Sequence, residues 1–395
     1  MDQKHRSALP VFLAFLAMGF GDAAGPFVGL AREQFQLSNF AAKLIPFVSF
    51  LMFGLFSVPL GVYQDKTGKK FILTFGLSLM LVGVLIPALM GLSTFPVFLV
   101  TMLMLGGGAT ALQVAGNPIM RDVSAEGKYA RNLSLGQFVK AIGSLSGPLI
   151  PVIAARSFGA SWTVIFPIYS VAILVTLLSV ATLRLQEQRA ADHKPTTLGS
   201  SLALLRNGYV AMMVLGIFLY VGAEVSVSSG IPLYLKDRFD VDINKIGLLG
   251  TGLFFLALTI GRFSGGIILN WMKPGRFLIV TSAVSVLGLL GIFVPSKPIA
   301  VVSFVFIGLG FANIFPLIFS IVVDSMPEHA NALSGLMITA ILGGAVIPPM
   351  MGLAADLLDS AQMAFVVPLA ALLYILWLSV ASSRRNQPGV QKPDR

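Results

Sequence analysis

Twelve stretches of predominantly apolar residues, each about as long as a helix that crosses a bilayer, follow one another along the chain. The hydrocarbon core of a bilayer is about 30 Å thick, so a helix rising about 1.5 Å per residue needs about 20 residues to cross it. The composition agrees, because 56% of the residues are hydrophobic and 11% are charged, against about 25% charged in soluble domains. The sequence therefore predicts an all-α membrane protein with twelve transmembrane helices. The spans are expected at 9–31, 40–63, 71–92, 96–120, 132–155, 162–183, 207–234, 243–271, 277–295, 298–323, 331–355 and 361–383.

The residue content argues against several other classes of protein. The chain has no Cys and three His, so we expect no disulfide and no metal site. The longest polar segment has about two dozen residues and carries no nucleotide-binding loop or Ser-His-Asp set, so an enzyme or a receptor is not favoured. The net charge of +10 comes from basic residues in the short segments between spans, which is typical of a topology signal rather than of nucleic-acid binding.

The positions of the charges predict the orientation in the membrane. The first apolar run ends in Arg-Glu and is too long for a cleavable signal peptide, so we interpret it as the first span. An even number of spans places both termini on one side. That side holds 18 Lys and Arg and the other side holds seven, so both termini are predicted to be cytoplasmic.

An internal repeat divides the chain into two pseudo-symmetric six-helix halves. The polar segment 184–206 is the predicted cytoplasmic linker, with halves at 1–183 and 207–395. Leu133, Ser134, Gly143 and Pro148 recur 200 residues later as Leu333, Ser334, Gly343 and Pro348. Asp22 in the first span corresponds to Glu224 in the seventh, an offset of 202.

The turn between spans 2 and 3 carries a motif of glycines and charges. It reads Gly61-Val-Tyr-Gln-Asp65-Lys-Thr-Gly68-Lys69-Lys70, and a degraded copy follows at 266–276. Glycines allow a tight turn, and Asp65 can pair with the lysines to hold a gate closed; an ordinary basic turn is the alternative. We interpret Gly61, Asp65, Gly68, Lys69 and Lys70 as a gate. The motif resembles the cytoplasmic signature of the major facilitator superfamily, which implies the major facilitator fold with substrate held between the halves.

Four further segments resemble the fucose:proton symporter family, which includes bacterial glucose, galactose and fucose permeases. They are 112–118 with 131–138, 220–229, 312–316 and 343–349. The resemblance implies a sugar cavity, a proton-titrating Asp matched by Asp22, and a place in the cell inner membrane. Two positions depart from the fucose permease, because Gln113 stands where it has Glu and Lys140 stands where it has Asn. The coupling mechanism therefore stays open between H⁺ coupling, Na⁺ coupling and uniport.

Charged residues inside the spans are candidates for function, because an ionisable group in hydrocarbon costs at least about 2.5 kcal/mol. Asp22 is either a titrating or substrate-binding carboxylate or a permanent partner of Lys140. Lys140 is a counter-ion, a donor to sugar hydroxyls or an attractor of an anionic substrate. Glu224 belongs to the family motif, or joins helices by hydrogen bonds. Arg262 is interpreted as structural, snorkelling or paired near the gate.

Sugar recognition needs amides and carboxylates, with aromatic faces for the apolar side of the ring. The predicted coupling residues are Asp22 and Glu224. Possible aromatic platforms are Tyr220, Phe311, Phe315 and Trp377. The predicted substrate-binding residues are Gln113, Asn117, Gln137, Lys140, Glu224 and Asn313.

We expect a secondary transporter that takes up a hexose or related sugar by alternating access, acts as a monomer in the lipid bilayer and uses no cofactor beyond a coupling ion. Two alternatives remain within transport. Gly143-Ser-Leu-Ser-Gly147-Pro148 resembles part of a motif of drug:proton antiporters, which would mean efflux of amphipathic compounds. Lys140 would instead favour an anionic sugar.

Overall fold

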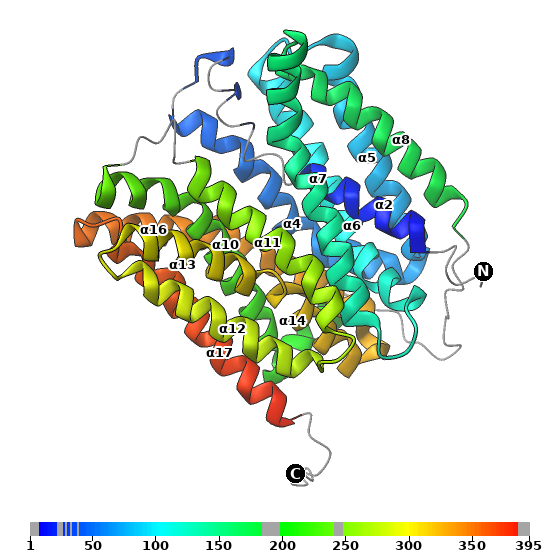
Figure 1. The fold of residues 1–395 in the computed structure, drawn as a ribbon. Helices are drawn as coiled ribbons and strands as arrows, with labels where there is room; N and C mark the ends of the chain where they lie inside the picture. The colour runs from blue at the N-terminus through cyan, green and yellow to red at the C-terminus, as the bar shows by residue number, and fades with distance from the viewer. Residues whose placement is uncertain are drawn as a thin grey trace. The chain divides into compact units, whose positions relative to one another are not determined.

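The computed structural model is helical almost throughout the part of the chain that it describes, residues 8–21, 27, 30–31, 34–37, 39–183, 198–240 and 248–385 (Figure 1). Within these residues, ten helical segments are long and apolar enough to cross a membrane. Of the two other predicted spans, the first is described in part, as α2 (Ala8–Gly21), and the fifth corresponds to α7 (Tyr129–Phe158). The prediction of an all-α membrane protein is confirmed. Asp22 lies outside the described residues.

Helix packing divides the chain into two compact units. The first comprises the chain up to Asn207 together with Met326–Leu342, and the second comprises Gly208–Ser325 and the chain from Gly343 onward. The boundary after Asn207 follows the predicted linker directly. The short segment Met326–Leu342 belongs to the second half by sequence, yet it packs with the first unit.

The described part of the first unit contains six α-helices of the N-terminal half, one short helix within the predicted linker and one short helix of the C-terminal half. Besides α2 and α7, they are α4 (Asn39–Thr67), α5 (Lys69–Met90), α6 (Phe95–Val123), α8 (Ile165–Ala181), α9 (Leu198–Ala203) and α15 (Ala330–Thr339). Short 3-10 turns flank them at η1 (Trp162–Val164), η2 (Leu204–Arg206), η4 (Pro327–His329) and η5 (Ala340–Leu342).

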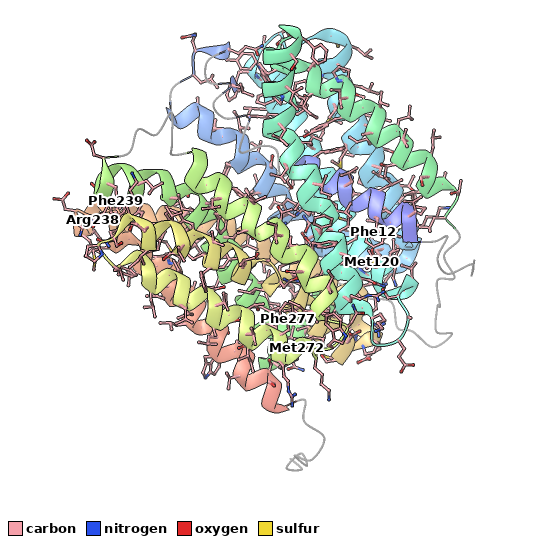
Figure 2. All side chains as sticks on the ribbon, in the orientation of Figure 1. Phe12, Met120, Arg238, Phe239, Met272 and Phe277 are labelled. Atoms are coloured by element: carbon pink, nitrogen blue, oxygen red, sulfur yellow. The ribbon has the colours of Figure 1, made fainter. Side chains whose placement is uncertain are left out.

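The second unit contains the remaining described helices. They are α10 (Gly208–Phe239), α11 (Leu248–Ile268), α12 (Pro274–Ile292), α13 (Lys297–Phe311), α14 (Ile314–Ser325), α16 (Gly343–Leu358) and α17 (Val366–Arg385), with a 3-10 turn η6 (Met363–Phe365). Figure 2 shows Arg238 and Phe239, at the end of α10, at one end of this unit. Met272 and Phe277, around the turn from α11 to α12, lie at its other end (Figure 2). The chain therefore crosses this unit between the end of α10 and the turn from α11 to α12 (Figure 2).

Polarity is distributed as expected for a protein in lipid. Long apolar side chains such as Leu89, Val171 and Leu287 are exposed. The amides of Gln113, Asn117, Gln137 and Asn313 are buried instead. Apolar side chains can face lipid without a free-energy cost, whereas polar side chains facing lipid are costly. Polar groups that serve a function are therefore expected in the interior of the protein.

Two predicted spans are broken, which the sequence analysis did not predict. The tenth ends as α13 at Phe311 and resumes as α14 at Ile314. Pro316 has no N–H to donate to the carbonyl of Ala312, which weakens the helix at this point. The eleventh is interrupted by η5 and resumes at Gly343-Gly344. The second break separates α15, in the first unit, from α16, in the second.

The sequence repeat is also a repeat in helix packing. A Cβ atom added to Gly143 of α7 would overlap the carbonyl oxygen of Leu16 in α2. A Cβ added to Gly343 of α16 would overlap the carbonyl oxygen of Phe218 in α10. These two pairs are related by the offsets of 200 and 202 found in the sequence. Only glycine lets α2 and α7 approach so closely in the first unit, and α10 and α16 in the second.

We expect Gly343→Ala to destabilise the protein by about 1–3 kcal/mol, because the added methyl group must push two backbones apart. Gly352→Ala on the same helix is the matched control, since a Cβ there meets nothing within 4 Å. It should change stability by at most about 1 kcal/mol, in the stabilising direction. Thermal unfolding in detergent measures both, and equal midpoints for the two variants would contradict the close crossing.

Candidate functional site

The predicted gate lies where α4 crosses α15 within the first unit. Gly68, at the turn between α4 and α5, has a φ of 92°, a conformation that favours glycine. A Cβ on Gly61 would lie 3.0 Å from the carbonyl oxygen of Asn331, and one on Gly335 would lie 2.7 Å from that of Ser57. Glycines on both helices therefore allow the crossing.

The described partner of Asp65 is Asn331 of α15. The side-chain amide of Asn331 donates to Asp65, and Gln64 Nε2 donates to Asn331 Oδ1 at 3.0 Å. The predicted pairing of Asp65 with the lysines is not what the structure describes. Lys69 pairs with Asp122, and Lys70 donates to the carbonyls of Ala181 and Leu183, at 2.8 Å in each case. The lysines thus tie α5 to α6 and α8, while Asp65 holds α15.

A second polar contact between α15 and the rest of the first unit depends on a proline. Pro118 lies inside α6 and has no N–H, so the carbonyl of Val114, one turn earlier, loses its usual helical donor. Ser334 Oγ of α15 donates to this carbonyl at 2.7 Å. The proline therefore creates an acceptor, and α15 supplies its donor.

We expect Ser334→Ala to loosen α15, because it leaves a buried carbonyl without a donor at a cost of about 1–3 kcal/mol. The chain has no Cys, so a single cysteine at Val58, whose Cα would lie 3.2 Å from a Cβ added to Gly335, can report exposure of the crossing. Alkylation of this cysteine should be faster in Ser334→Ala. Ser320→Ala is the control, since buried Ser320 donates within its own helix. Identical alkylation rates in Ser334→Ala and in the parent would contradict the idea that the bond from Ser334 to Val114 holds α15 in place.

Four predicted substrate-binding residues lie on two packed helices of the first unit, α6 and α7. Gln113 and Asn117 are one turn apart on α6 and are 1% and 0% exposed. Gln137 on α7 is also buried, and Lys140 follows it by three residues at intermediate burial. Both amide atoms of Asn117 and Nε2 of Gln137 are buried and have no hydrogen-bond partner.

The position of Lys140 bears on its predicted pairing with Asp22. Its backbone carbonyl lies against Gly19 of α2, at the crossing of α2 and α7. Gly19 precedes Asp22 by three residues, so the two helices bring the backbones of this region together. Because Asp22 is outside the described residues, the ion pair stays a prediction.

The other two predicted substrate-binding residues lie in the second unit. Asn313 occupies the break between α13 and α14, where its Nδ2 donates to the carbonyl of Gly261 in α11 at 2.7 Å. Glu224 of α10 forms an ion pair with Arg262 of α11, with 3.6 Å between Oε1 and Nη2. Arg262 was expected to be structural or paired near the gate, and its described partner is this candidate site residue.

The predicted aromatic platforms differ in their surroundings. Tyr220 and Phe311 are buried and meet edge to face, with ring centroids 5.8 Å apart. Phe315 is buried against Phe319. Trp377 is 54% exposed on α17, beside Tyr374. Of the four, Tyr220 lies one turn from Glu224 and is therefore next to the candidate polar groups.

Comparison with known proteins identifies the family. The model of the Major Facilitator Superfamily matches residues 11–349. The chain belongs to this superfamily. It is a multi-pass membrane transporter, not an enzyme, as the sequence predicted.

Two relatives and one solved structure are similar over most of the chain. A glucose/galactose transporter of Brucella abortus is 27% identical over 369 residues, covering 89% of this chain and 88% of its own length. The L-fucose-proton symporter of Escherichia coli is 23% identical over 371 residues, covering 85% and 84%. A crystal structure of the E. coli fucose:proton symporter superposes with a TM-score of 0.83 at 18% identity, covering 96% of this chain and 99% of that one. The structural likeness confirms the fold.

Sequence reasoning missed several residues that the structure connects to the candidate site. Asn331, Ser334 and Gln64 hold α15, although Ser334 was visible as part of the internal repeat. Arg262 was noticed as an intramembrane charge but was not assigned to the site. An arginine inside a span needs a compensating carboxylate, and Glu224 was one of the two intramembrane carboxylates that the sequence offered.

Proposed function

We propose that this transporter takes up a hexose or a related sugar by alternating access, coupled to a flow of H⁺ or Na⁺. The relatives named above are sugar transporters by their names. The observation that carries the proposal is a set of buried amide atoms that have no hydrogen-bond partner among the described residues, in side chains chosen from the sequence as sugar-binding. They are both amide atoms of Asn117, Nε2 of Gln137 and Oδ1 of Asn313.

The energetics of buried polar groups explain why this observation matters. More than about 90% of buried polar groups in folded proteins have a hydrogen-bond partner. Each one without a partner costs about 1–3 kcal/mol. A transporter that leaves several such amide atoms unpaired loses stability unless a ligand supplies the missing hydrogen bonds. Sugar hydroxyls both donate and accept hydrogen bonds, so they suit amide groups better than an apolar compound does. This favours a sugar over the amphipathic substrates of an efflux pump.

The remaining roles follow from the same proposal. Gln113, Asn117, Gln137, Lys140, Glu224 and Asn313 are assigned to substrate binding, and Asp22 and Glu224 to coupling. Asp65, with Asn331 as its partner, is assigned to the gate. We further propose that the protein acts as a monomer in the bacterial inner membrane with both termini in the cytoplasm, which is the orientation that the excess of basic residues favours.

Uptake into proteoliposomes tests the proposal directly. Purified protein would be reconstituted and offered radiolabelled D-glucose, D-galactose, L-fucose and D-glucuronate under an imposed H⁺ gradient, an imposed Na⁺ gradient or none. We expect accumulation of at least one neutral sugar that depends on one of the two gradients. Accumulation of none of these sugars, or export of apolar dyes in their place, would refute sugar uptake.

We expect Gln137→Ala to weaken sugar binding roughly tenfold while leaving the unliganded protein no less stable, because the amide nitrogen has no partner to lose. Gln362→Ala is the matched control, since Gln362 donates to the carbonyl of Ile292 at 2.8 Å. The control should bind sugar normally and unfold at a lower temperature. Binding affinity and thermal midpoint, measured in parallel, decide the matter, and normal binding by Gln137→Ala would remove this residue from the site.

The variant Lys140→Ala distinguishes two possible roles of this lysine, recognition of an anionic substrate and pairing with Asp22. If Lys140 recognises an anionic substrate, the change abolishes binding of glucuronate and spares neutral sugars. If it is the partner of Asp22, the change alters the pH dependence of binding, and its effect is not additive with that of Asp22→Asn. We expect the second result. Binding over a range of pH for the parent, both single variants and the double variant gives the answer, and additive effects with unchanged pH profiles would exclude the pair.

A further inference from the structure

A compact polar cluster inside the second unit includes two residues, Tyr220 and Arg262, whose polar atoms have not been assigned a contact with the substrate. Tyr220 and Glu224 are four residues apart on α10 and therefore share one face of that helix. Arg262 reaches them from α11, which packs against α10. We call these three residues the Arg262 cluster.

The hydrogen bonding of the Arg262 cluster is incomplete. An arginine and a carboxylate frequently form two parallel hydrogen bonds of about 2.7–2.9 Å. Here the single contact between Nη2 and Oε1 is 3.6 Å long, and the buried Nε of Arg262 has no partner. The Tyr220 hydroxyl interacts with both charged side chains, but it makes no hydrogen bond shorter than 3.5 Å to any described residue. The cluster thus holds an Arg262 donor and a Tyr220 hydroxyl for which the described residues supply no hydrogen bond of normal length.

Neighbouring residues hold these groups in place. The Tyr220 ring packs against Phe311, which in turn contacts Phe254 of α11 with centroids 5.9 Å apart. The amide of Asn313 is fixed by its bond to the carbonyl of Gly261, the residue before Arg262, and its Oδ1 is also unpaired. Tyr220 is 1% exposed, whereas the side chain of Glu224 is 19% exposed, so the cluster is not sealed. The groups are oriented before any ligand arrives, which lowers the entropic cost of binding.

We infer that the Arg262 cluster is a binding subsite for adjacent hydroxyls of a neutral polyhydroxylated ligand, with Arg262 and Tyr220 as ligand-contacting residues. This inference rests on the proposed function and specifies its substrate class. One ligand hydroxyl accepts a hydrogen bond from Arg262 Nε. Another donates to the Glu224 carboxylate and forms a hydrogen bond with the Tyr220 hydroxyl.

The charges of the cluster select against an anionic ligand. Glu224 already balances Arg262, so the cluster as a whole carries no net charge. A carboxylate that approached Arg262 would meet Glu224, and the repulsion of two like charges in a low-dielectric interior is strong. A neutral sugar meets no such penalty, because its hydroxyls match a donor and an acceptor side by side.

The test compares binding and stability in the same variants. Tyr220→Phe removes a hydroxyl that has no partner, so we expect sugar binding to weaken roughly three- to tenfold with no fall in the thermal midpoint of the unliganded protein. Tyr374→Phe is the matched control, because the Tyr374 hydroxyl donates to the carbonyl of Met212 at 3.0 Å. It should leave binding unchanged and lower the midpoint.

Arg262→Lys keeps the charge and removes the Nε donor, so binding of D-galactose should weaken about tenfold or more while the ion pair with Glu224 is retained. If Arg262→Lys does not fold, the double variant Glu224→Gln/Arg262→Gln is measured in its place, because it removes both charges together. We expect the same loss of D-galactose binding in the double variant. In the parent protein, D-glucuronate should bind at least tenfold more weakly than D-galactose.

The outcomes separate the subsite from the proposed function. If the parent protein binds none of the neutral sugars, the proposed function fails and the ligand class fails with it. If the parent binds a neutral sugar and Tyr220→Phe and the Arg262 variant bind it equally well, the subsite alone is overturned. Preferential binding of D-glucuronate through Arg262 would also overturn it, because the cluster would then recognise an anion.

Discussion

A backbone carbonyl or amide in the hydrocarbon of a bilayer must find its partner inside the protein, because no water is present to replace it. Helices satisfy this requirement along most of the chain, and prolines interrupt it at a few defined places. Pro118 has no N–H to donate to the carbonyl of Val114, and Ser334 Oγ of α15 donates a hydrogen bond to this carbonyl instead. A short helix that comes late in the sequence is thereby bound to a helix that comes early. Asp65, Asn331 and Gln64 add to the same contact. The contacts of α15 at the proposed gate are thus a consequence of the need to satisfy backbone and side-chain polar groups.

The same requirement gives meaning to the groups that remain unsatisfied. Asn117 and Gln137 in the first unit, and Tyr220, Arg262 and Asn313 in the second, have buried polar atoms without partners. A protein that needed only to fold would gain stability by replacing them with apolar residues. Their retention has a simple physical account if a polar solute supplies the missing hydrogen bonds for part of the transport cycle. Stability and function then act in opposite directions at these positions.

Glycines set the geometry in which these side chains are presented. At Gly143 and Gly343 a backbone carbonyl of a neighbouring helix occupies the space that a Cβ would need. The two crossings are equivalent by the internal repeat, yet the intramembrane charges near them differ. The first unit has Lys140 on α7, whereas the second has Arg262 on α11 as the partner of Glu224. The repeat therefore conserves the packing of the backbone and allows the two units to carry different polar groups.

Much of this organisation is determined by the sequence alone. Apolar runs of about 20 residues require membrane-spanning helices, because nothing else satisfies the backbone in lipid. The offsets of 200 and 202 predict a repeat that the crossings at Gly143 and Gly343 reproduce. Intramembrane polar residues such as Gln137 and Glu224 stand out by composition. The partners of these residues were not predictable, because hydropathy records the depth of a residue but not the direction in which its side chain points. Only the tertiary structure decided that Asp65 bonds to Asn331, that Arg262 pairs with Glu224, and that Met326–Leu342 packs with the first unit. Each of these contacts joins residues far apart in sequence or on different helices, and helix rotation and crossing angle, which follow from packing all the side chains together, determine whether they meet.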